Sequence, residues 1–386
     1  MNKPRILLVS KLYHPWVGGV EQNVQDLAEG LRDEFDIRVL CCNEIPGSKS
    51  QNPQLINGIA VYKVPSLGIY WSMPIAPRFP FWLKKLAQEA DIIHYHLPFP
   101  LATISHFLVN SKLRIKNSKF IISWHSAIVR QKVANIFLKP WTKRLLNRAN
   151  AIAVSSERLK SSSEELAPFY SKCRTIPLGI NPAPYEQPEN FKDSTEEIRA
   201  KYNNAPLILC VGRLVPYKGA EYLIRAMRAV NSGAQLLLIG EGPLRDSLQN
   251  LATQLHLQNR IHFLGKLEGK RLIAFYHACD FFVLPSITAN EAFGLVQLEA
   301  MACGKPVINT NLPTGVPWVS LGGETGLTVE PGNSEALSEA INKLLSDAPL
   351  RKKLGAQAKT RVQHYFTKSA MCEQFGNLYH DLLKTK

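Results

Sequence analysis

The sequence predicts an α/β protein made of two arrays of alternating strands and helices. Short apolar runs, typical of buried parallel strands, recur from Arg5–Ser10 near the start to Val307–Asn309 far along the chain. Amphipathic stretches with a helical period separate them. At 386 residues the chain is longer than one hydrophobic core usually supports, so two domains are expected.

The first array begins with the strand Arg5–Ser10, which leads into a loop containing Gly18 and Gly19 and then into a helix. A glycine pair at this place lets backbone N–H groups approach a phosphate closely. A plain tight turn explains the pair as well, because GG is not the GxGxxG motif. The further strands predicted in this array are Ile37–Cys41, Ile59–Val64, Asp91–His96, Phe120–Ser123, Ala151–Val154 and Arg174–Leu178.

Three histidines stand near the carboxyl ends of predicted strands. His94 and His96 share one face of their strand because side chains alternate along it. A metal pair is one interpretation, but no third ligand stands nearby at a recognisable spacing, and a role in packing or as a pocket wall is favoured. His125 follows the next strand, where open α/β sheets place their ligands, although a structural role is the alternative.

A proline-rich stretch, Pro177–Pro188, predicts the connection between the two arrays. A basic turn with Arg213 and Lys218 follows the next strand and precedes a helix from Ala220, and the last helical run spans Lys368–Leu383. The strands predicted in the second array are Leu207–Val211, Gln235–Ile239, Ile261–Leu264, Phe281–Leu284 and Val307–Asn309.

The stretch Asn290–Val307 (NEAFGLVQLEAMACGKPV) holds two glutamates, Glu291 and Glu299, within a helical pattern. A strand, a short polar loop and a helix starting near Phe293 would aim free N–H groups at an anion. On one helix the glutamates would lie about 12 Å apart, beyond the roughly 5 to 9.5 Å of a glycoside hydrolase pair. That separation suits the two ends of a sugar nucleotide, while a surface helix with two solvated glutamates is the alternative.

The formal net charge of +15 is unevenly distributed, because residues 92–156 contain no Asp or Glu. Such a surface suits nucleic acid, anionic lipid head groups or a phosphorylated substrate. Basic amphipathic segments with tryptophan, Tyr70–Ala87 and Arg130–Arg148, favour contact with an anionic membrane surface; ordinary helices packed on the core are the alternative. The basic residues of the acid-free window are Lys112, Arg114, Lys116, Lys119, Arg130, Lys132, Lys139, Lys143, Arg144 and Arg148.

The cysteines and the apolar runs indicate the cellular location of the protein. The seven cysteines form no CxxC pair, which predicts a reduced cytoplasmic chain without a metal cluster or a disulfide framework. Met1–Pro4 leads directly into a strand, so no signal peptide is expected. No apolar run approaches the roughly 20 residues of a spanning helix. The expected location is the cytoplasm, peripheral on the inner face of the cytoplasmic membrane.

Several motifs, in this order along nearly the whole chain, resemble the GT4-type family of retaining GT-B glycosyltransferases. They are Tyr13–Glu21 (YHPWVGGVE), Leu209–Gly219 (LCVGRLVPYKG), Gly240–Leu244 (GEGPL), Glu291 with Glu299 after Pro285, and Gly304–Pro306 (GKP). The resemblance implies two Rossmann-like domains facing across a cleft. Residues 1–182 would bind the acceptor, residues 183–365 would bind the nucleotide sugar, and a helix at about 366–386 would pack back on the first domain.

The resemblance also implies roles for the donor-site residues. Arg213 and Lys218 would bind the donor diphosphate and stabilise the leaving phosphate as its charge develops. Glu291 would contact hydroxyls of the donor sugar, and Glu299 would accept hydrogen bonds from the ribose hydroxyls. The residues that would contribute through the backbone are Ala292, Phe293, Gly294 and Leu295 for sugar and phosphate, and Lys266 and Leu267 for the base.

In the first domain, Gly18 and Gly19 would lie against the diphosphate, and His125 would lie near the anomeric carbon. Family members are proposed to retain the anomeric configuration, with the donor phosphate taking the acceptor proton and with no protein nucleophile. No metal is expected, because the two basic side chains and the helix amides would do its work. Asn290 and Ala292 depart from the common pattern, since many relatives carry glycine at the second position, which affects donor choice.

The predicted function is transfer of a hexose, with GDP-mannose as the expected donor, to a lipid-linked saccharide acceptor in cell-surface polysaccharide synthesis such as that of O-antigen. The pattern looks most like mannosyl and rhamnosyl transferases, and His125, Glu291, Arg213 and Lys218 are the expected catalytic residues. The alternatives are a UDP-sugar-dependent transferase of the same family and a nucleotide-sugar epimerase of the same fold. A nucleic-acid-binding protein is disfavoured because no DNA- or RNA-binding motif is present.

Overall fold

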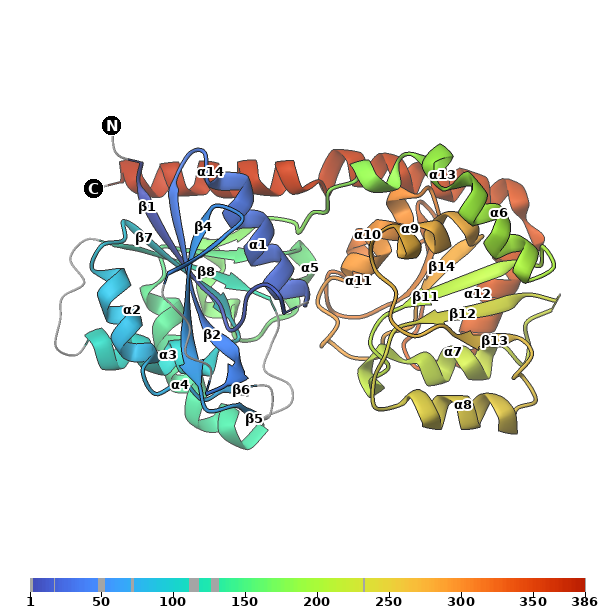
Figure 1. The fold of residues 1–386 in the computed structure, drawn as a ribbon, viewed down its shortest axis with the longest axis horizontal. Coiled ribbons are helices and arrows are strands. Elements are labelled where there is room, and N and C mark those ends of the chain that lie inside the picture. Colours follow the sequence, from blue (N-terminus) through green and yellow to red (C-terminus); the bar gives the residue numbers. More distant parts are fainter. Residues whose placement is uncertain are drawn as a thin grey trace. The chain divides into compact units, whose positions relative to one another are not determined.

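The computed structural model describes residues 3–16, 18–47, 53–70, 73–110, 118–125, 132–231 and 233–385. The chain divides into two compact units (Figure 1). The N-terminal unit comprises Met1–Leu178 and Lys368–Lys386, and the C-terminal unit comprises Gly179–Thr367. Each unit is an open, mostly parallel sheet with helices packed on it, so the predicted α/β class with two Rossmann-like domains is confirmed.

The N-terminal unit has an eight-stranded sheet in the order β10-β9-β8-β7-β1-β2-β4-β3, in which only the β3–β4 pair is antiparallel. Its strands are β1 (Arg5–Val9), β2 (Asp36–Pro46), β3 (Gln54–Ile56), β4 (Ile59–Ser66), β7 (Ile92–Leu97), β8 (Lys119–Trp124), β9 (Ala151–Val154) and β10 (Cys173–Thr175), with a separate hairpin of β5 (Ile69–Tyr70) and β6 (Met73–Pro74). Its helices are α1 (Gly19–Leu31), α2 (Phe79–Ala87), α3 (Pro100–Asn110), α4 (Lys132–Arg148), α5 (Glu157–Ser162), a 3-10 helix (Ala167–Lys172) and α14 (Lys368–Lys384).

Alternation along β1 divides this unit's core between the two faces of the sheet. Leu7 and Val9 pack with α2, α3 and α4, whereas Ile6 and Leu8 pack with α1 and α14. The helix α14, drawn in red in Figure 1, lies against α1 although the two are far apart in the sequence. The end of the chain therefore contributes to the core built by its beginning.

The C-terminal unit has a six-stranded, fully parallel sheet in the order β13-β12-β11-β14-β15-β16. Its strands are β11 (Leu207–Val211), β12 (Gln235–Ile239), β13 (Ile261–Phe263), β14 (Phe281–Leu284), β15 (Val307–Thr310) and β16 (Gly326–Val329). Its helices are α6 (Lys192–Lys201), α7 (Ala220–Ala226), α8 (Arg245–Gln254), α9 (Gly269–Ala278), α10 (Leu295–Ala302), α11 (Val316–Val319), α12 (Ser334–Ser346) and α13 (Ala348–Tyr365), with 3-10 helices at Ala183–Tyr185, Pro188–Phe191 and Pro216–Lys218.

Both sheets follow the doubly wound order 3-2-1-4-5-6, counting β1, β2, β4, β7, β8 and β9 in the first unit and β11 to β16 in the second. In such sheets the strand order reverses between the first and fourth strands, and ligands bind outside the carboxyl ends of those strands. The topology therefore points to the ends of β1 and β7 in one unit and of β11 and β14 in the other.

The structure corrects the sequence prediction around the two glutamates. The helix α10 begins only at Leu295, because Gly294 takes a left-handed conformation (φ 75°) immediately before it. Glu299 lies on this helix, but Glu291 lies in the turn that precedes it. The helical pattern that was predicted to run between the glutamates is therefore wrong over its first part, and the 12 Å separation on a single helix does not apply.

All seven cysteines are free thiols. Across the described residues, no helix combines the length and apolar character needed to cross a lipid bilayer. Within the same residues, no group of three or more His, Cys, Asp or Glu side chains is placed to hold a metal ion.

Candidate active site

The loops after β11 and β14 meet at the strand-order reversal of the C-terminal unit. The backbone N–H of Ile287 donates to the carbonyl of Tyr217 over 2.8 Å. Gly219 follows in a left-handed conformation (φ 69°), and a β-carbon there would collide with the carbonyl oxygen of Pro285. Glycine is thus required for the close approach of the two loops, which brings the basic turn against the segment that carries Glu291.

This approach creates a buried ion pair between Lys218 and Glu291. Lys218 Nζ lies 2.6 Å from Glu291 Oε2, and the two side chains are only 16% and 10% exposed. Ser286 Oγ donates a further hydrogen bond of 2.9 Å to the same carboxylate oxygen. Burial lowers the pKa of Lys218, but the Glu291 carboxylate raises it, and the balance lies above the ordinary value. Lys218 therefore stays cationic at neutral pH, with ammonium protons left for an anion.

Sequence reasoning selected Lys218 and Glu291 for separate parts of the donor but did not predict their contact. Ser286 was missed, although its place directly after a strand and Pro285 was a usable signal. A pair of this kind costs desolvation free energy, and removing one partner leaves the other charge buried and uncompensated. The pair thus holds the carboxylate and the ammonium in fixed positions.

Arg213 lies in the same loop but is exposed, and it forms no ion pair with any described residue. Its loop is fixed by its neighbours: the N–H of Leu214 donates to the carbonyl of Glu241 over 2.9 Å. Gly240 adopts φ 140°, and a β-carbon there would strike the carbonyl of Gly212. The glycine-rich GEGPL segment therefore lets the loops after β11 and β12 pack together, leaving the Arg213 guanidinium free to meet an anion.

Lys266 and Leu267 follow β13 at the same edge of the sheet. The N–H of Gly240 donates to the carbonyl of Gly265 over 2.8 Å, which places this segment beside the glycine-rich loop. Lys266 is exposed and pairs with Glu268 at 2.7 Å, a surface contact of little energetic weight. The predicted contact of these two residues with the base, through the backbone, stays a prediction.

Glu299 is held by two tyrosines that sequence reasoning missed. The Tyr276 hydroxyl on α9 donates to Glu299 Oε2 over 2.7 Å, and the hydroxyl of Tyr185 donates to the same carboxylate. Burial raises the pKa of Glu299 and the two hydroxyl hydrogen bonds lower it, with a net shift above the ordinary value. Tyr185 comes from the proline-rich connection, and nothing in its local sequence indicates this partner.

The turn before α10 is held by contacts from several elements. Phe293 is buried and its ring packs 5.9 Å from that of Phe366. Gln297 Nε2 donates to the carbonyl of Phe293 over 2.7 Å, and the N–H of Gly315 donates to the carbonyl of Ala292 over 2.8 Å. These contacts hold residues 292–295 in place through side chains and carbonyl groups, which leaves the turn suited to present N–H groups at the start of the helix.

The remaining predicted residues belong to the N-terminal unit. Gly18 is the residue before α1 and Gly19 is its first residue. The Glu21 carboxylate folds back over Gly18, onto the position that a β-carbon of residue 18 would occupy. His125 is buried after β8 and hydrogen-bonds His96 over 3.0 Å. His96 and His94 are buried as well, in agreement with a packing role.

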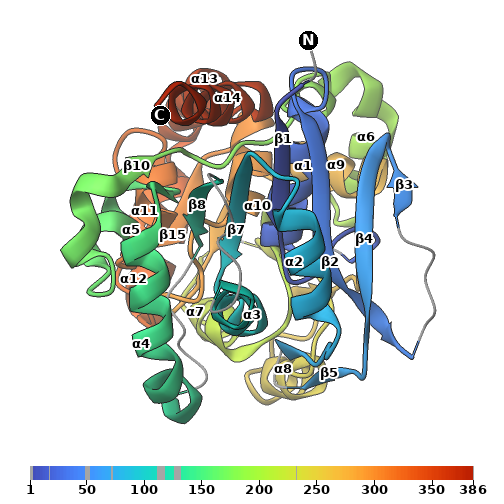
Figure 2. The same ribbon diagram turned by 90° about the vertical axis from the view of Figure 1, so that its left-hand side faces the viewer.

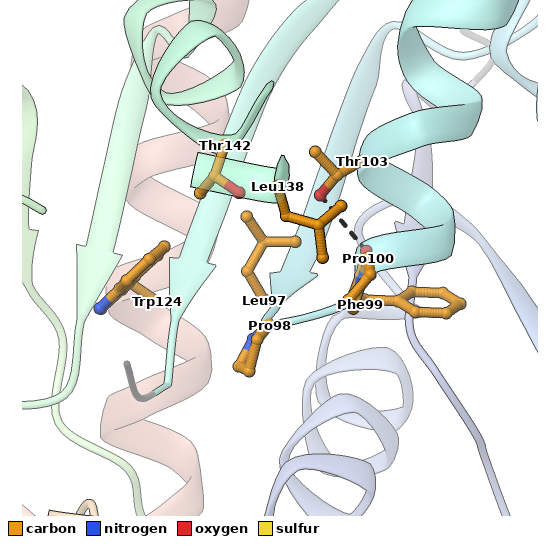
Figure 3. A pocket seen from close by; sticks show the side chains of 8 residues that line it. All are labelled: Leu97, Pro98, Phe99, Pro100, Thr103, Trp124, Leu138 and Thr142. Carbon is orange, nitrogen blue, oxygen red and sulfur yellow. Dashed lines mark hydrogen bonds between the residues drawn. The ribbon is translucent and has the colours of Figure 1, made fainter. Parts of the chain in front are cut away.

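A small pocket lies at the carboxyl ends of β7 and β8 (Figure 3). The lining that the described residues provide is mostly apolar and uncharged: Leu97, Pro98, Phe99, Pro100, Thr103, Trp124, Leu138 and Thr142. The Thr103 hydroxyl is satisfied by the carbonyl of Phe99 at 3.3 Å. The described lining of this small pocket offers no charged partner for a phosphate.

Two doubly wound units in one chain make up the GT-B fold. Solved structures share this fold. Sucrose-phosphate synthase from Thermosynechococcus elongatus superposes with a TM-score of 0.79 at 24% identity over 100% of both chains. Anabaena HepE, solved with UDP and glucose, gives a TM-score of 0.79 at 20% identity over 98% of this chain and 100% of its own.

The chain belongs to the family 4 glycosyltransferases. The model described as Glycosyltransferase Family 4 matches residues 17–184, and that described as Glycosyl transferases group 1 matches residues 191–361. D-rhamnosyltransferase WbpZ of Pseudomonas aeruginosa is 29% identical over 94% of this chain and 92% of its own. The O-antigen chain mannosyltransferase C of Escherichia coli is 28% identical over 99% and 100%. The protein is therefore an enzyme, a hexosyltransferase.

Proposed function

We propose that the enzyme transfers mannose from GDP-mannose to a lipid-linked saccharide acceptor, with retention of anomeric configuration, in the synthesis of a cell-surface polysaccharide. The observation that carries the donor-binding part is the Lys218–Glu291 pair at the strand-order reversal, with the exposed Arg213 in the same loop as Lys218. Relatives named for D-rhamnosyl transfer and for O-antigen mannosyl transfer, matched over nearly the full length, support the choice of sugar and pathway.

In this proposal Lys218 and Arg213 bind the diphosphate and stabilise the charge that develops on it as the glycosidic bond to phosphate breaks. Glu291, oriented by Lys218 and Ser286, accepts hydrogen bonds from hydroxyls of the donor sugar. The leaving phosphate takes the proton of the acceptor hydroxyl, so no side chain has to act as nucleophile. The fixed cations supply the charge stabilisation that a metal ion would otherwise provide.

Other residues hold the rest of the donor. Glu299, oriented by Tyr276 and Tyr185, accepts from the ribose hydroxyls. The backbone of Ala292, Phe293, Gly294 and Leu295 contacts the sugar and phosphate, and that of Lys266 and Leu267 contacts the base. From the N-terminal unit, Gly18 and Gly19 contribute backbone to the diphosphate and His125 contributes its ring to the sugar.

We further propose that α2, α3 and α4 rest on the anionic inner surface of the cytoplasmic membrane. These helices pack side by side on one face of the N-terminal sheet (Figure 2). They expose large apolar side chains, Phe81 by 63%, Leu108 by 61% and Trp141 by 41%. Exposed basic side chains stand among them: Lys84, Lys85, Lys139, Lys143 and Arg144. Lys112, Arg114, Lys116, Arg130 and Trp71, which sequence reasoning included, lie outside the described residues.

The exposed apolar side chains suit the acyl boundary of a bilayer, and the basic side chains suit anionic lipid head groups. Flotation with phosphatidylglycerol vesicles should bring the enzyme to the top of the gradient, and neutral vesicles should not. Retention on DNA in preference to the anionic vesicles would contradict the membrane assignment and return the basic surface to the nucleic-acid interpretation.

The donor assignment is tested by incubating the enzyme with a panel of sugar nucleotides and measuring thermal stabilisation and slow hydrolysis. GDP-mannose should give the largest upward shift of the melting temperature, because a ligand that binds only the folded state stabilises it. Response to a UDP-sugar with none to GDP-mannose would overturn the mannose assignment and favour the UDP-dependent alternative. Interconversion of sugar nucleotides without transfer would favour an epimerase.

A further inference from the structure

Three buried histidine rings lie in a continuous row in the N-terminal unit, here called the histidine stack: His94, His96 and His125. His94 and His96 lie face to face, whereas the near-coplanar rings of His96 and His125 meet edge to edge. The ring centroids of His94 and His96 on β7 lie 4.4 Å apart, and those of His96 and His125 lie 5.3 Å apart. His96 Nδ1 and His125 Nε2 share a hydrogen bond of 3.0 Å. The stack thus joins the end of β7 to the residue that follows β8.

The far end of the stack is anchored on the C-terminal helix. His94 Nδ1 lies 2.7 Å from the hydroxyl of Tyr379 on α14, and His94 Nε2 lies 2.8 Å from Ser123 Oγ on β8. Both nitrogens of His94 are therefore hydrogen-bonded, so its ring is fixed. Because His96 stacks on this fixed ring, its own orientation toward His125 is fixed as well.

All three rings are neutral at physiological pH. Burial lowers the pKa of His94 to about 3 and that of His125 to about 4, and burial together with its two histidine neighbours lowers the pKa of His96 well below the usual range. A neutral imidazole has one N–H and one lone pair. In the bond between His96 and His125, one ring must therefore donate and the other must accept.

The unpaired nitrogen of His96 indicates which ring donates. Among the described residues, His96 Nε2 is buried and has no hydrogen-bond partner. If His96 accepted at Nδ1, its proton would sit on Nε2 and a buried N–H would be stranded. A buried N–H without a partner is rarer and costlier than an unused acceptor lone pair. The favoured arrangement therefore has His96 Nδ1–H donating to His125 Nε2.

We infer that His96 is a positioning residue that holds His125 in the Nδ1–H tautomer. With Nε2 accepting from His96, the proton of the neutral His125 ring lies on Nδ1, so Nδ1 is the ring nitrogen that can donate to a ligand. Under the proposed function, His125 would thus present a hydrogen-bond donor to an oxygen of the donor sugar, and it would not act as the base that removes the acceptor proton. Only this last consequence rests on the proposed function.

The tautomer can be measured directly in the full-length protein labelled with ¹⁵N-histidine, using long-range ¹H–¹⁵N correlations of the rings. The expected spectrum has His125 protonated on Nδ1 and unprotonated on Nε2. In His96→Phe, which keeps a ring in the stack but removes the donor, the His125 proton should move at least partly to Nε2. In His96→Asn, whose side-chain amide stands near the original Nδ1, the wild-type pattern should persist.

Either of two results would overturn the inference: a wild-type His125 protonated on Nε2, or a His125 pattern that stays unchanged in His96→Phe. The matched control is His106→Phe. His106 is another buried histidine of this unit, but it bonds the hydroxyl of Tyr95, which lies on the opposite face of β7 from His96. His106→Phe should leave the His125 signals unchanged. A shift of these signals would show that the loss of any buried histidine disturbs the His125 ring.

The kinetic consequence is measured with the donor that the panel identifies. A misdirected catalytic group can cost on the order of 10²-fold in rate, so kcat of His96→Phe should fall by about that factor, with most of it restored in His96→Asn. A kcat of His96→Phe equal to wild type, with the tautomer shifted, would refute the donor role of His125. If wild-type enzyme turns over no sugar nucleotide, the proposed function fails while the spectra still decide the tautomer.

Discussion

The two units share one strand order, yet the strand ends that carry their predicted site residues differ in chemical character. In the C-terminal unit, β11 and β14 lead to an ion pair, Lys218 with Glu291, and to the exposed cation Arg213. In the N-terminal unit, β7 and β8 lead to neutral imidazole rings whose pKa values burial holds low. Strand ends of the same topology therefore carry charged groups in one unit and uncharged hydrogen-bonding groups in the other.

This difference fits the two chemical parts of the proposed reaction. A diphosphate needs fixed cations, whose charge is maintained here by a buried carboxylate partner. Sugar hydroxyls need donors and acceptors of defined direction, which neutral rings supply without the cost of burying charge. Substitutions should therefore reduce activity and donor binding most at the charged site and least at the neutral backbone positions.

The largest effect is expected for Lys218→Ala. It removes a diphosphate cation and leaves Glu291 buried without its counter-charge, so kcat/KM should fall by about 10³-fold and donor affinity should weaken. Steady-state kinetics and calorimetric titration of the donor measure both quantities. Arg225→Ala breaks an exposed pair with Glu221 in the same unit and should change neither. Unchanged donor affinity in Lys218→Ala would rule out its contact with the diphosphate.

Glu291→Gln should reduce kcat by about 10²-fold and should also introduce a pH dependence. Burial lowers the pKa of Lys218 and Glu291 raises it, so removal of the carboxylate charge shifts the balance downward. The Lys218 charge would then be lost as pH rises through the lowered pKa, so donor affinity should fall at alkaline pH values at which the wild-type enzyme still binds. The donor affinity of the wild-type enzyme should stay constant over the same pH range. Identical pH profiles for both proteins would contradict the pairing of Lys218 with Glu291.

Tyr276→Phe should weaken nucleotide binding by about tenfold, the value of one hydrogen bond to a charged group. Burial raises the pKa of Glu299 and the hydroxyl lowers it, so the variant raises that pKa further. Affinity for the nucleoside diphosphate should therefore decline at a higher pH than in wild type as the solution is acidified. Tyr202→Phe, at another buried tyrosine of the unit, is the control. If nucleotide affinity declined at the same acidic pH in wild type, Tyr276→Phe and Tyr202→Phe, Glu299 would be excluded as the ribose ligand.

The smallest effect is expected for Gly18→Ala. The backbone there is extended and tolerates a side chain, but the new methyl group would displace the Glu21 carboxylate. A loss of about 1 kcal/mol in donor binding, or roughly fivefold, is expected by calorimetry. Gly233→Ala, at a site with no neighbour within 4 Å of the added carbon, should bind like wild type. A tighter-binding Gly18→Ala would show that Glu21, and not Gly18, limits access of the anion.

Sequence patterns were sufficient for most of the sheets. The interior strands Ala151–Val154, Leu207–Val211, Gln235–Ile239 and Phe281–Leu284 are found with the predicted bounds, because strands buried on both faces form nearly continuous apolar runs. The strands β3 and β16 were not predicted. Both are short edge strands with polar residues and partial exposure, and they leave no continuous apolar run in the sequence.

The sequence by itself determined the α/β class, the two arrays and the residue types of the candidate site, because apolar period, glycine and charge are local properties of the chain. The tertiary structure decided the partnerships. Lys218 meets Glu291, Tyr276 and Tyr185 meet Glu299, and His96 meets His125. Each partnership joins segments that are distant along the chain, and their directions depend on sheet order and loop approach. Only the folded chain sets these distances, and they determine which groups stay charged and which proton faces the ligand.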